Sequence, residues 1–235
     1  MAIAVDENTA WQTTSAGPSA NNFTTAGSNR ILIVGVRLRS TEVSGVSVTF
    51  DGAAMTEFNS VINVFSNVDL RAFYLINPAL GTKSLSVSYT GTPSSALLVY
   101  AASYTGALQS GQPDSSANNK NTASTSLTTT TTVVASNCWL VGFFFQDYGT
   151  VSAGAGTTIR DQTIDGSGVM DSNGAVSTGS QSLIFTVAGS ASMGAVIASI
   201  AAAPGPSLSP SSSSSASLSP SASLSPSASL SPSGA

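Results

Sequence analysis

Apolar and polar residues alternate one by one along most of the chain, which is the pattern of strands and not of helices. The segment "VSVTF" (46–50) puts Val46, Val48 and Phe50 on one face, and "KSLSVSYT" (83–90) alternates leucine, valine and tyrosine with serine. Successive side chains of an extended strand point to opposite faces, so this alternation predicts strands that are buried on one side. Such half-buried strands are typical of antiparallel sheets.

Further strands are predicted from runs of apolar residues that are separated by turn signals such as Asp51-Gly52 and Asn77-Pro78. No window has the spacing of an amphipathic helix. About ten strands with short connections predict an all-β fold, an antiparallel two-sheet sandwich of the jelly-roll type. The further strands are expected at residues 30–38, 70–76, 96–104, 126–134, 138–146, 157–164, 182–187 and 194–201.

Composition divides the chain into three parts. We expect an N-terminal arm with a first strand in residues 1–27, a β-sandwich domain in residues 28–203, and a tail rich in Ser, Pro, Ala and Leu in residues 204–235. The core of the domain is expected to be built from large apolar side chains on the predicted strands. They are Phe50, Phe73, Leu75, Leu85, Val87, Tyr89, Trp139, Leu140, Phe143, Phe145 and Phe185.

The tail repeats the hexapeptide Ser-Leu-Ser-Pro-Ser-Ala and carries no charge. Its regular prolines disfavour a helix and favour an extended or polyproline conformation. One interpretation is a disordered low-complexity spacer. The other is a strip that docks on a neighbouring subunit, because an extended repeat places Leu, Pro and Ala on one face and Ser on the other. The candidate interaction strip consists of Leu218, Pro220, Leu224, Pro226, Leu230 and Pro232.

Charged residues are scarce, at 8% of the chain against roughly 25% in an average soluble protein. The net charge is −4 and the seven basic residues form no run, so neither a nucleic acid nor an anionic membrane surface is expected as a partner. The apolar run at 193–203 is too short to span a bilayer. The N-terminus lacks the basic and apolar regions of a secretory signal.

The residue types exclude several kinds of catalysis. The chain has no His and one Cys, which removes imidazole-based mechanisms, Cys/His zinc sites and intrachain disulfides. Cys138 is expected to be a small buried side chain and not a reactive thiol. Asp161, Asp165 and Asp171 form at most a weak candidate for a calcium loop. Asp147 and Asp161 are candidates for a pair of hydrolase carboxylates, but no sequence motif supports the pair. We therefore expect no enzyme, with no catalytic, cofactor-binding or metal site and no cofactor.

Two groups of side chains are candidates for binding. Exposed aromatic rings would suit a glycan, although packing in the core or at an interface is the alternative for each ring. The aromatic candidates are Trp11, Tyr104 and Tyr148. Three arginines are expected on outer sheet faces if their apolar neighbours point inward, where they would contact a neighbouring subunit or solvent. They are Arg37, Arg39 and Arg71.

Several motifs occur in an order that marks a resemblance. They are "SNRILIVGV", "VSVTFDGAAMT", "LRAFYLINPALGTKSLSVSYTGT" and "AASYTGALQSGQP". This series is similar to an uncharacterised β-sandwich module of bacteriophage structural proteins and large bacterial surface proteins, over residues 28–203. The resemblance implies a fold and a setting, and no catalytic residues that could be carried over.

The function predicted from these observations is that of a non-enzymatic bacteriophage virion structural protein, a capsid decoration or fibre-like accessory protein. Its expected partners are further copies of itself and other virion proteins such as capsid or tail subunits, and its expected location is the virion after assembly in the host cytoplasm. The alternative is a bacterial cell-surface or glycan-binding module with a stalk, located outside the cell. The chain is expected to consist of one module and a tail, which favours the virion protein over a large surface protein.

Overall fold

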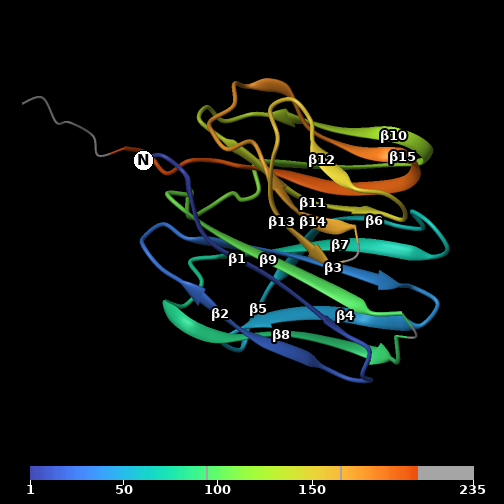
Figure 1. Cartoon of the computed structure of the whole chain (residues 1–235). Helices are drawn as coiled ribbons and strands as arrows, with labels where there is room; N and C mark the ends of the chain where they lie inside the picture. The colour runs from blue at the N-terminus through green and yellow to red at the C-terminus, as the bar shows by residue number, and fades with distance from the viewer. Residues whose placement is uncertain (94, 165, 206–235) are drawn as a thin grey trace, which may run out of the picture. The chain divides into compact units, whose positions relative to one another are not determined.

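The computed structural model describes residues 1–93, 95–164 and 166–205 (Figure 1). Met1–Gly205 forms one compact unit. The candidate interaction strip, from Leu218 to Pro232, lies outside the described residues and stays a prediction.

The all-β, antiparallel fold is confirmed: the described residues contain fifteen strands and no helix, and every strand pair is antiparallel. Accordingly, the described part has no helix long and apolar enough to cross a membrane. The strands are β1 (Ala4–Thr13), β2 (Ser19–Thr25), β3 (Ile31–Arg39), β4 (Val43–Phe50), β5 (Ala53–Ala54), β6 (Thr56–Val61), β7 (Val68–Ile76), β8 (Gly81–Gly91), β9 (Leu97–Thr105), β10 (Ser115–Val133), β11 (Trp139–Gln146), β12 (Val151–Ala153), β13 (Thr158–Ile164), β14 (Ser167–Asp171) and β15 (Gly179–Ile200).

The strands form three stacked sheets, one more than the expected pair. In the view of Figure 1 the lower sheet has the order β2-β8-β4-β5, the middle sheet β1-β9-β3-β7-β6, and the upper sheet β10-β15-β11-β14-β13 with β12 beside β15. The middle sheet is covered on both faces: Ile33 of β3 belongs to the cluster that includes Phe143 of the upper sheet, and Val34 to the cluster that includes Phe50 of the lower sheet. The nearly continuous apolar sequence of β3 follows from this double burial.

A glycine allows the middle and upper sheets to approach closely. Gly35 of β3 faces the ring of Phe143, and a Cβ atom at this position would lie 2.4 Å from Phe143 Cγ. A side chain of any size at position 35 would therefore displace the ring or separate the two sheets.

The two longest strands change partners along their length. The part of β15 at residues 193–200 pairs with β11, and its part at 185–187 pairs with β12. Both parts pair with β10, whose register is irregular at 122–126. This ribbon covers the outer face of β11, where the rings of Phe144 and Phe185 lie 4.9 Å apart. The predicted strands at 182–187 and 194–201 are therefore two parts of one strand.

Residues 1–27 contribute two strands, which join different sheets. Ala4 to Thr13 of β1 pair with β9 in the middle sheet, and Ser19 to Thr25 of β2 pair with β8 in the lower sheet. Both are edge strands. The N-terminal arm of the sequence analysis is thus an integral part of the described unit.

The expected core is confirmed for nine of its eleven side chains, which are at most 8% exposed, and the other two, Leu75 and Trp139, are partly buried against the same clusters.

Candidate functional site

The expectation that Arg37 lies on an outer sheet face is wrong. Arg37 is 8% exposed, and its guanidinium carbon lies 4.4 Å from the centre of the Phe145 ring. The reason is that β3 lies in the middle of three sheets, so both of its faces are covered. Arg71 is half-buried and forms an ion pair of 3.4 Å with Glu57.

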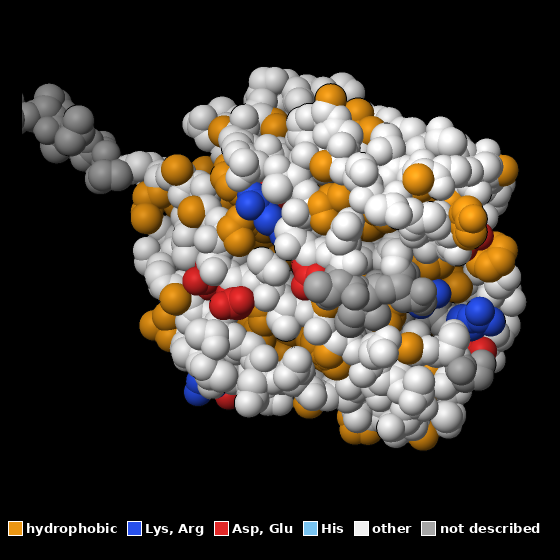
Figure 2. All heavy atoms as spheres, viewed as in Figure 1, with side chains coloured by type: hydrophobic (Ala, Val, Ile, Leu, Met, Phe, Trp, Pro, Cys, Tyr) orange, Lys and Arg blue, Asp and Glu red, His pale blue; other side chains and the backbone are white. Residues whose placement is uncertain are grey.

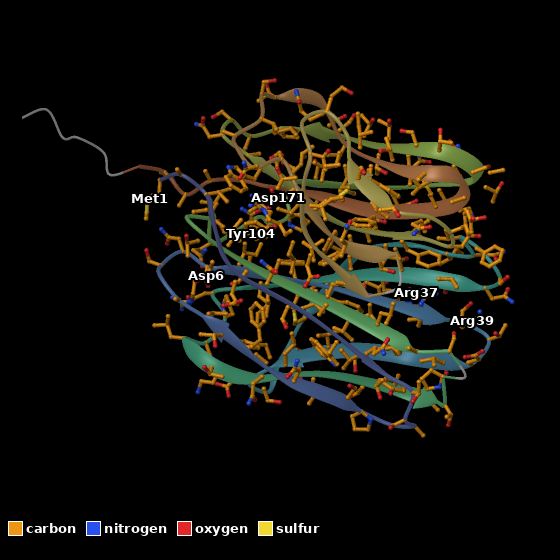
Figure 3. The ribbon with its side chains drawn as sticks, in the orientation of Figure 1. Met1, Asp6, Arg37, Arg39, Tyr104 and Asp171 are labelled. Atoms are coloured by element: carbon orange, nitrogen blue, oxygen red, sulfur yellow. The ribbon has the colours of Figure 1, made fainter. Side chains whose placement is uncertain are left out.

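Arg37 and Arg39 line a small cavity, here called the arginine hollow. Figure 3 shows the two side chains near one end of β3. The cavity has a volume of about 160 Å³, and its other walls come from the β6–β7 connection and from the end of β11. Its lining residues are Arg37, Arg39, Phe65, Val68, Phe145, Gln146 and Asp147. A volume of this size would hold about five water molecules or one small polar group.

Arg39 brings an uncompensated positive charge to the hollow. The side chain of Arg39 takes part in no hydrogen bond or ion pair among the described residues, and its Nε is buried without a partner there. Its backbone carbonyl accepts a hydrogen bond of 3.0 Å from Glu42 N. A buried donor without a partner costs about 1–3 kcal/mol, more where the group is charged. The guanidinium is therefore prepared to bind an acceptor that enters the hollow.

The segment after β11 is held in a fixed shape beside the arginines. Gln146 is 4% exposed; its side-chain oxygen accepts a hydrogen bond from the backbone N–H of Tyr148, and its amide donates to Gly149 O at 2.7 Å. Asp147 Oδ1 accepts a hydrogen bond of 2.7 Å from the backbone of Ser192. Because of these bonds, Asp147 is fixed in the wall of the hollow and Tyr148 is held outward, with 68% of its surface exposed.

The β6–β7 connection is anchored equally well. Val64 is 1% exposed and packs against Gly194, where a Cβ atom would lie 2.5 Å from Val64 Cγ2. Lys120 Nζ donates hydrogen bonds to the carbonyls of Ile62 and Asn63 at 2.8 and 3.2 Å. Phe65 stays 44% exposed on this anchored segment. Figure 2 shows hydrophobic and basic side chains next to one another at the right of the view, where Figure 3 has Arg39.

The two hydrolase candidates, Asp147 and Asp161, do not share a cavity. Asp147 lines the arginine hollow, whereas Asp161 lines a separate surface hollow between β12 and β13. In glycosidases the paired carboxyl groups flank one scissile bond. The structure therefore does not unite these two side chains in one site.

The aspartates of the weak calcium loop are also not gathered. Asp171 is fully buried and forms an ion pair with Arg160 at 2.7 Å, Asp161 faces the β12–β13 hollow, and Asp165 lies outside the described residues. Among the described residues there is no group of three or more acidic or cysteine side chains placed to hold a metal ion.

Tyr104 belongs to a buried polar network and not to a binding surface. It is fully buried, and its hydroxyl donates a hydrogen bond of 3.1 Å to Asp171 Oδ2. Burial, and after it the Asp171 carboxylate, raises the pKa of Tyr104 well above its ordinary value. The hydrogen bond to Asp171 likewise raises the pKa of Arg160. The network joins β9 of the middle sheet to β13 and β14 of the upper sheet (Figure 3).

Of the aromatic candidates, Tyr148 alone is exposed. Trp11 is half-buried, and its indole N–H donates a hydrogen bond of 3.1 Å to Ser19 Oγ. Phe65 was not among the candidates, although a large hydrophobic residue between the turn-forming residues of "NVFSN" is a signal that sequence reasoning can use.

Cys138 is buried, as expected. Its Sγ donates a hydrogen bond of 3.2 Å to Ala135 O, and burial raises the pKa of the thiol. A thiol that holds its proton is a poor nucleophile, so the packing role is the one that the structure supports.

The polar motif residues of the resemblance hold a turn-rich corner of the fold. Arg30 is 9% exposed and donates hydrogen bonds to Pro78 O at 3.0 Å, Gly27 O at 2.6 Å and Asn77 Oδ1 at 2.9 Å. Gln109 closes the corner because its amide donates to Arg30 O at 3.2 Å. These residues therefore have a structural role.

A comparison with known protein families, curated proteins and solved structures found nothing that matches this chain.

Proposed function

We propose that this chain is a non-enzymatic structural protein of a bacteriophage virion, a capsid decoration protein or a fibre-like accessory protein. The observation that carries the proposal is the similarity of its motifs to the module of phage structural proteins. The structure supports it in one respect: the motifs run along β3, β4, β7, β8 and β9, and their polar residues Arg30, Asn77 and Gln109 bond to one another at one corner.

The proposed partners are further copies of the chain and other virion proteins such as capsid or tail subunits. A hydroxyl-rich face supports this proposal. Thr128, Thr130 and Thr132 alternate outward along β10, and Thr130 Oγ1 lies 2.7 Å from Ser182 Oγ of β15. An uncharged face of this kind forms hydrogen bonds to a neighbouring subunit without the cost of desolvating charges.

The composition of the native assembly tests this proposal. We expect mass spectrometry of purified virions to detect the chain in a fixed ratio to the capsid or tail subunits, and an image of the particle to locate it on a shell, tail or fibre. Recovery of the chain in a host cell envelope and not in particles would contradict the virion role and favour the second candidate.

The second candidate is a bacterial cell-surface or glycan-binding module. The arginine hollow favours it, since an exposed aromatic ring beside a few fixed polar groups is typical of a ligand site. Binding of the full chain to a glycan array, together with fractionation of the producing cells, distinguishes this candidate from a purely structural protein.

A further inference from the structure

We propose that the arginine hollow binds the carboxylate of an acidic saccharide, with Arg39 as the charged contact and Phe65 as the surface on which the sugar ring stacks. The inference does not depend on whether the chain is a virion component or a cell-surface module, because it concerns one site of the isolated chain.

The unpaired guanidinium of Arg39 favours a carboxylate as the ligand. The Arg39 side chain forms no hydrogen bond or ion pair with the described residues, and the one carboxylate in the lining, that of Asp147, accepts a hydrogen bond from the backbone of Ser192. A planar guanidinium offers parallel N–H donors that match the two oxygens of a carboxylate. An anion with two or more charges would be less favourable, because it would lie against Asp147 as well as against Arg39.

The volume of the hollow limits what enters it. About 160 Å³ accommodates a carboxylate with the carbon that bears it, and no more than the edge of a sugar ring. The rest of the saccharide must then lie on the rim. Phe65, which is 44% exposed, lines the hollow from the β6–β7 connection, so its ring is placed to pack against the C–H groups of the sugar.

The uncharged part of a sugar also matches the site. Sugar hydroxyls donate hydrogen bonds, and Asp147 in the wall of the hollow is an acceptor fixed by Ser192. Tyr148 follows Asp147 in the chain and is 68% exposed, which extends the aromatic surface next to the hollow. A peptide carboxylate lacks this array of hydroxyls, so a saccharide uses more of the site.

The walls of the site are rigid, which lowers the cost of binding. Gln146 fixes the segment after β11 through its bonds to Tyr148 and Gly149, and Val64 anchors the segment that carries Phe65. Binding to preformed walls does not require the ordering of loops or of several long side chains.

Binding of the full chain to matched pairs of saccharides tests the proposal. The probes are an array of uronate-, sialate- and pyruvate-bearing oligosaccharides with their neutral counterparts, followed by titration calorimetry with the best acidic probe, its methyl ester and inorganic phosphate. We expect binding of the acidic probe, weaker binding at high salt, and at least a tenfold loss of affinity for the methyl ester. Absence of any acidic binder, equal affinity for the methyl ester, or tighter binding of phosphate would overturn the proposal.

Variants of single residues assign the binding to this hollow. We expect Arg39→Gln to weaken binding at least tenfold, Phe65→Ala at least threefold, and the matched control Arg71→Gln to leave affinity unchanged. Arg39→Lys keeps the charge and loses the planar fork, so its affinity should lie between those of the wild type and Arg39→Gln. Arg39→Lys also serves as the test variant if Arg39→Gln does not fold. If folded Arg39 variants and Phe65→Ala bind as well as the wild type, the ligand lies elsewhere and the proposal fails. Particle composition tests the virion role separately, so either proposal can fail alone.

Discussion

Arg160 Nε lies 2.7 Å from Asp171 Oδ2, and this ion pair is buried on its acidic side, with Asp171 fully covered and 21% of the Arg160 side chain exposed. The same carboxylate oxygen accepts the hydrogen bond of Tyr104. A carboxylate in this position links the middle and upper sheets through polar contacts in an otherwise apolar interface.

Substitution of the buried carboxylate is expected to be costly. Asp171→Asn removes the charge that compensates Arg160. Loss of one partner of a buried ion pair lowers the free energy of unfolding by about 3–5 kcal/mol. Here we expect a value near the lower limit, because Arg160 reaches solvent. Urea denaturation measures the free energy of unfolding. The matched control is Glu57→Gln at the half-exposed pair with Arg71, where we expect at most about 1 kcal/mol. Equal losses of unfolding free energy in the two variants would show that burial of the Arg160–Asp171 pair does not increase its contribution to stability.

Stability should fall at alkaline pH because of Tyr104. An unfolded tyrosine titrates near pH 10, whereas burial and the Asp171 carboxylate raise the pKa of Tyr104 in the folded chain. Its contribution is therefore complete below about pH 10 and is lost as the pH rises toward the higher folded pKa.

Denaturation between about pH 9 and 12 checks this prediction, since that window brackets the unfolded pKa. Tyr104→Phe should flatten the decline of the free energy of unfolding above pH 10. Burial also raises the pKa of Cys138, so both proteins are best compared in a Cys138→Ala background. An unchanged decline in the Phe variant would assign the alkaline loss to other groups.

Gly35→Ala is expected to destabilise the chain by about 1–3 kcal/mol, the range for overpacking. The added Cβ would lie 2.4 Å from Cγ of the fully buried Phe143. Gly174→Ala is the matched control, because the nearest atom to its Cβ is Ser172 O at 4.0 Å. Thermal unfolding monitored by circular dichroism should show a lower midpoint for Gly35→Ala and little change for the control.

Arg30→Lys should cost about 2 kcal/mol, since an ammonium group cannot reach three acceptors that lie around a planar fork. The lost contacts are those to Pro78, Gly27 and Asn77 at the motif corner. Arg71→Lys, at the half-exposed ion pair with Glu57, controls for the change of residue type and should leave the denaturation midpoint nearly unchanged. A midpoint that is equally unaffected in Arg30→Lys would mean that the corner adapts to lysine.

The two interpretations of the tail predict different hydrogen exchange at residues 216–235 in the native assembly. A spacer exchanges uniformly and fast, and a docked strip shows protection at its leucines and alanines. Leu224→Ser should change the exchange only if the strip is docked.

The sequence predicts most of the longer strands, and its unbroken apolar runs also carry a signal for the number of layers. The alternation in β8 gives its orientation directly, because Leu85, Val87 and Tyr89 face the core. The unbroken apolar runs of β3 and β9 indicate burial on both faces, which a two-sheet sandwich cannot provide. These runs therefore indicate a third layer, and an interpretation with two sheets places Arg37 wrongly on an outer face.

Other features have no local signal. The first half of β10, "SSANNKNTAS", has no apolar alternation, and it is a strand because β15 pairs with it along its whole length. The arginine hollow joins residues of β3, the β6–β7 connection and the end of β11, which are far apart in the sequence. Only the packing of the middle sheet against the upper sheet brings them together.

The pairing of β1 and β2 has a consequence for the order in which the protein folds. Ala4 pairs with Thr105, and Ser19 pairs with Val87, so β1 and β2 are synthesised well before the strands that they pair with. Contacts between residues so distant in sequence slow folding, and all-β domains of this kind fold in milliseconds to seconds. We therefore expect the middle and lower sheets to close only after β9 has left the ribosome, with the N-terminal strands among the last to join them.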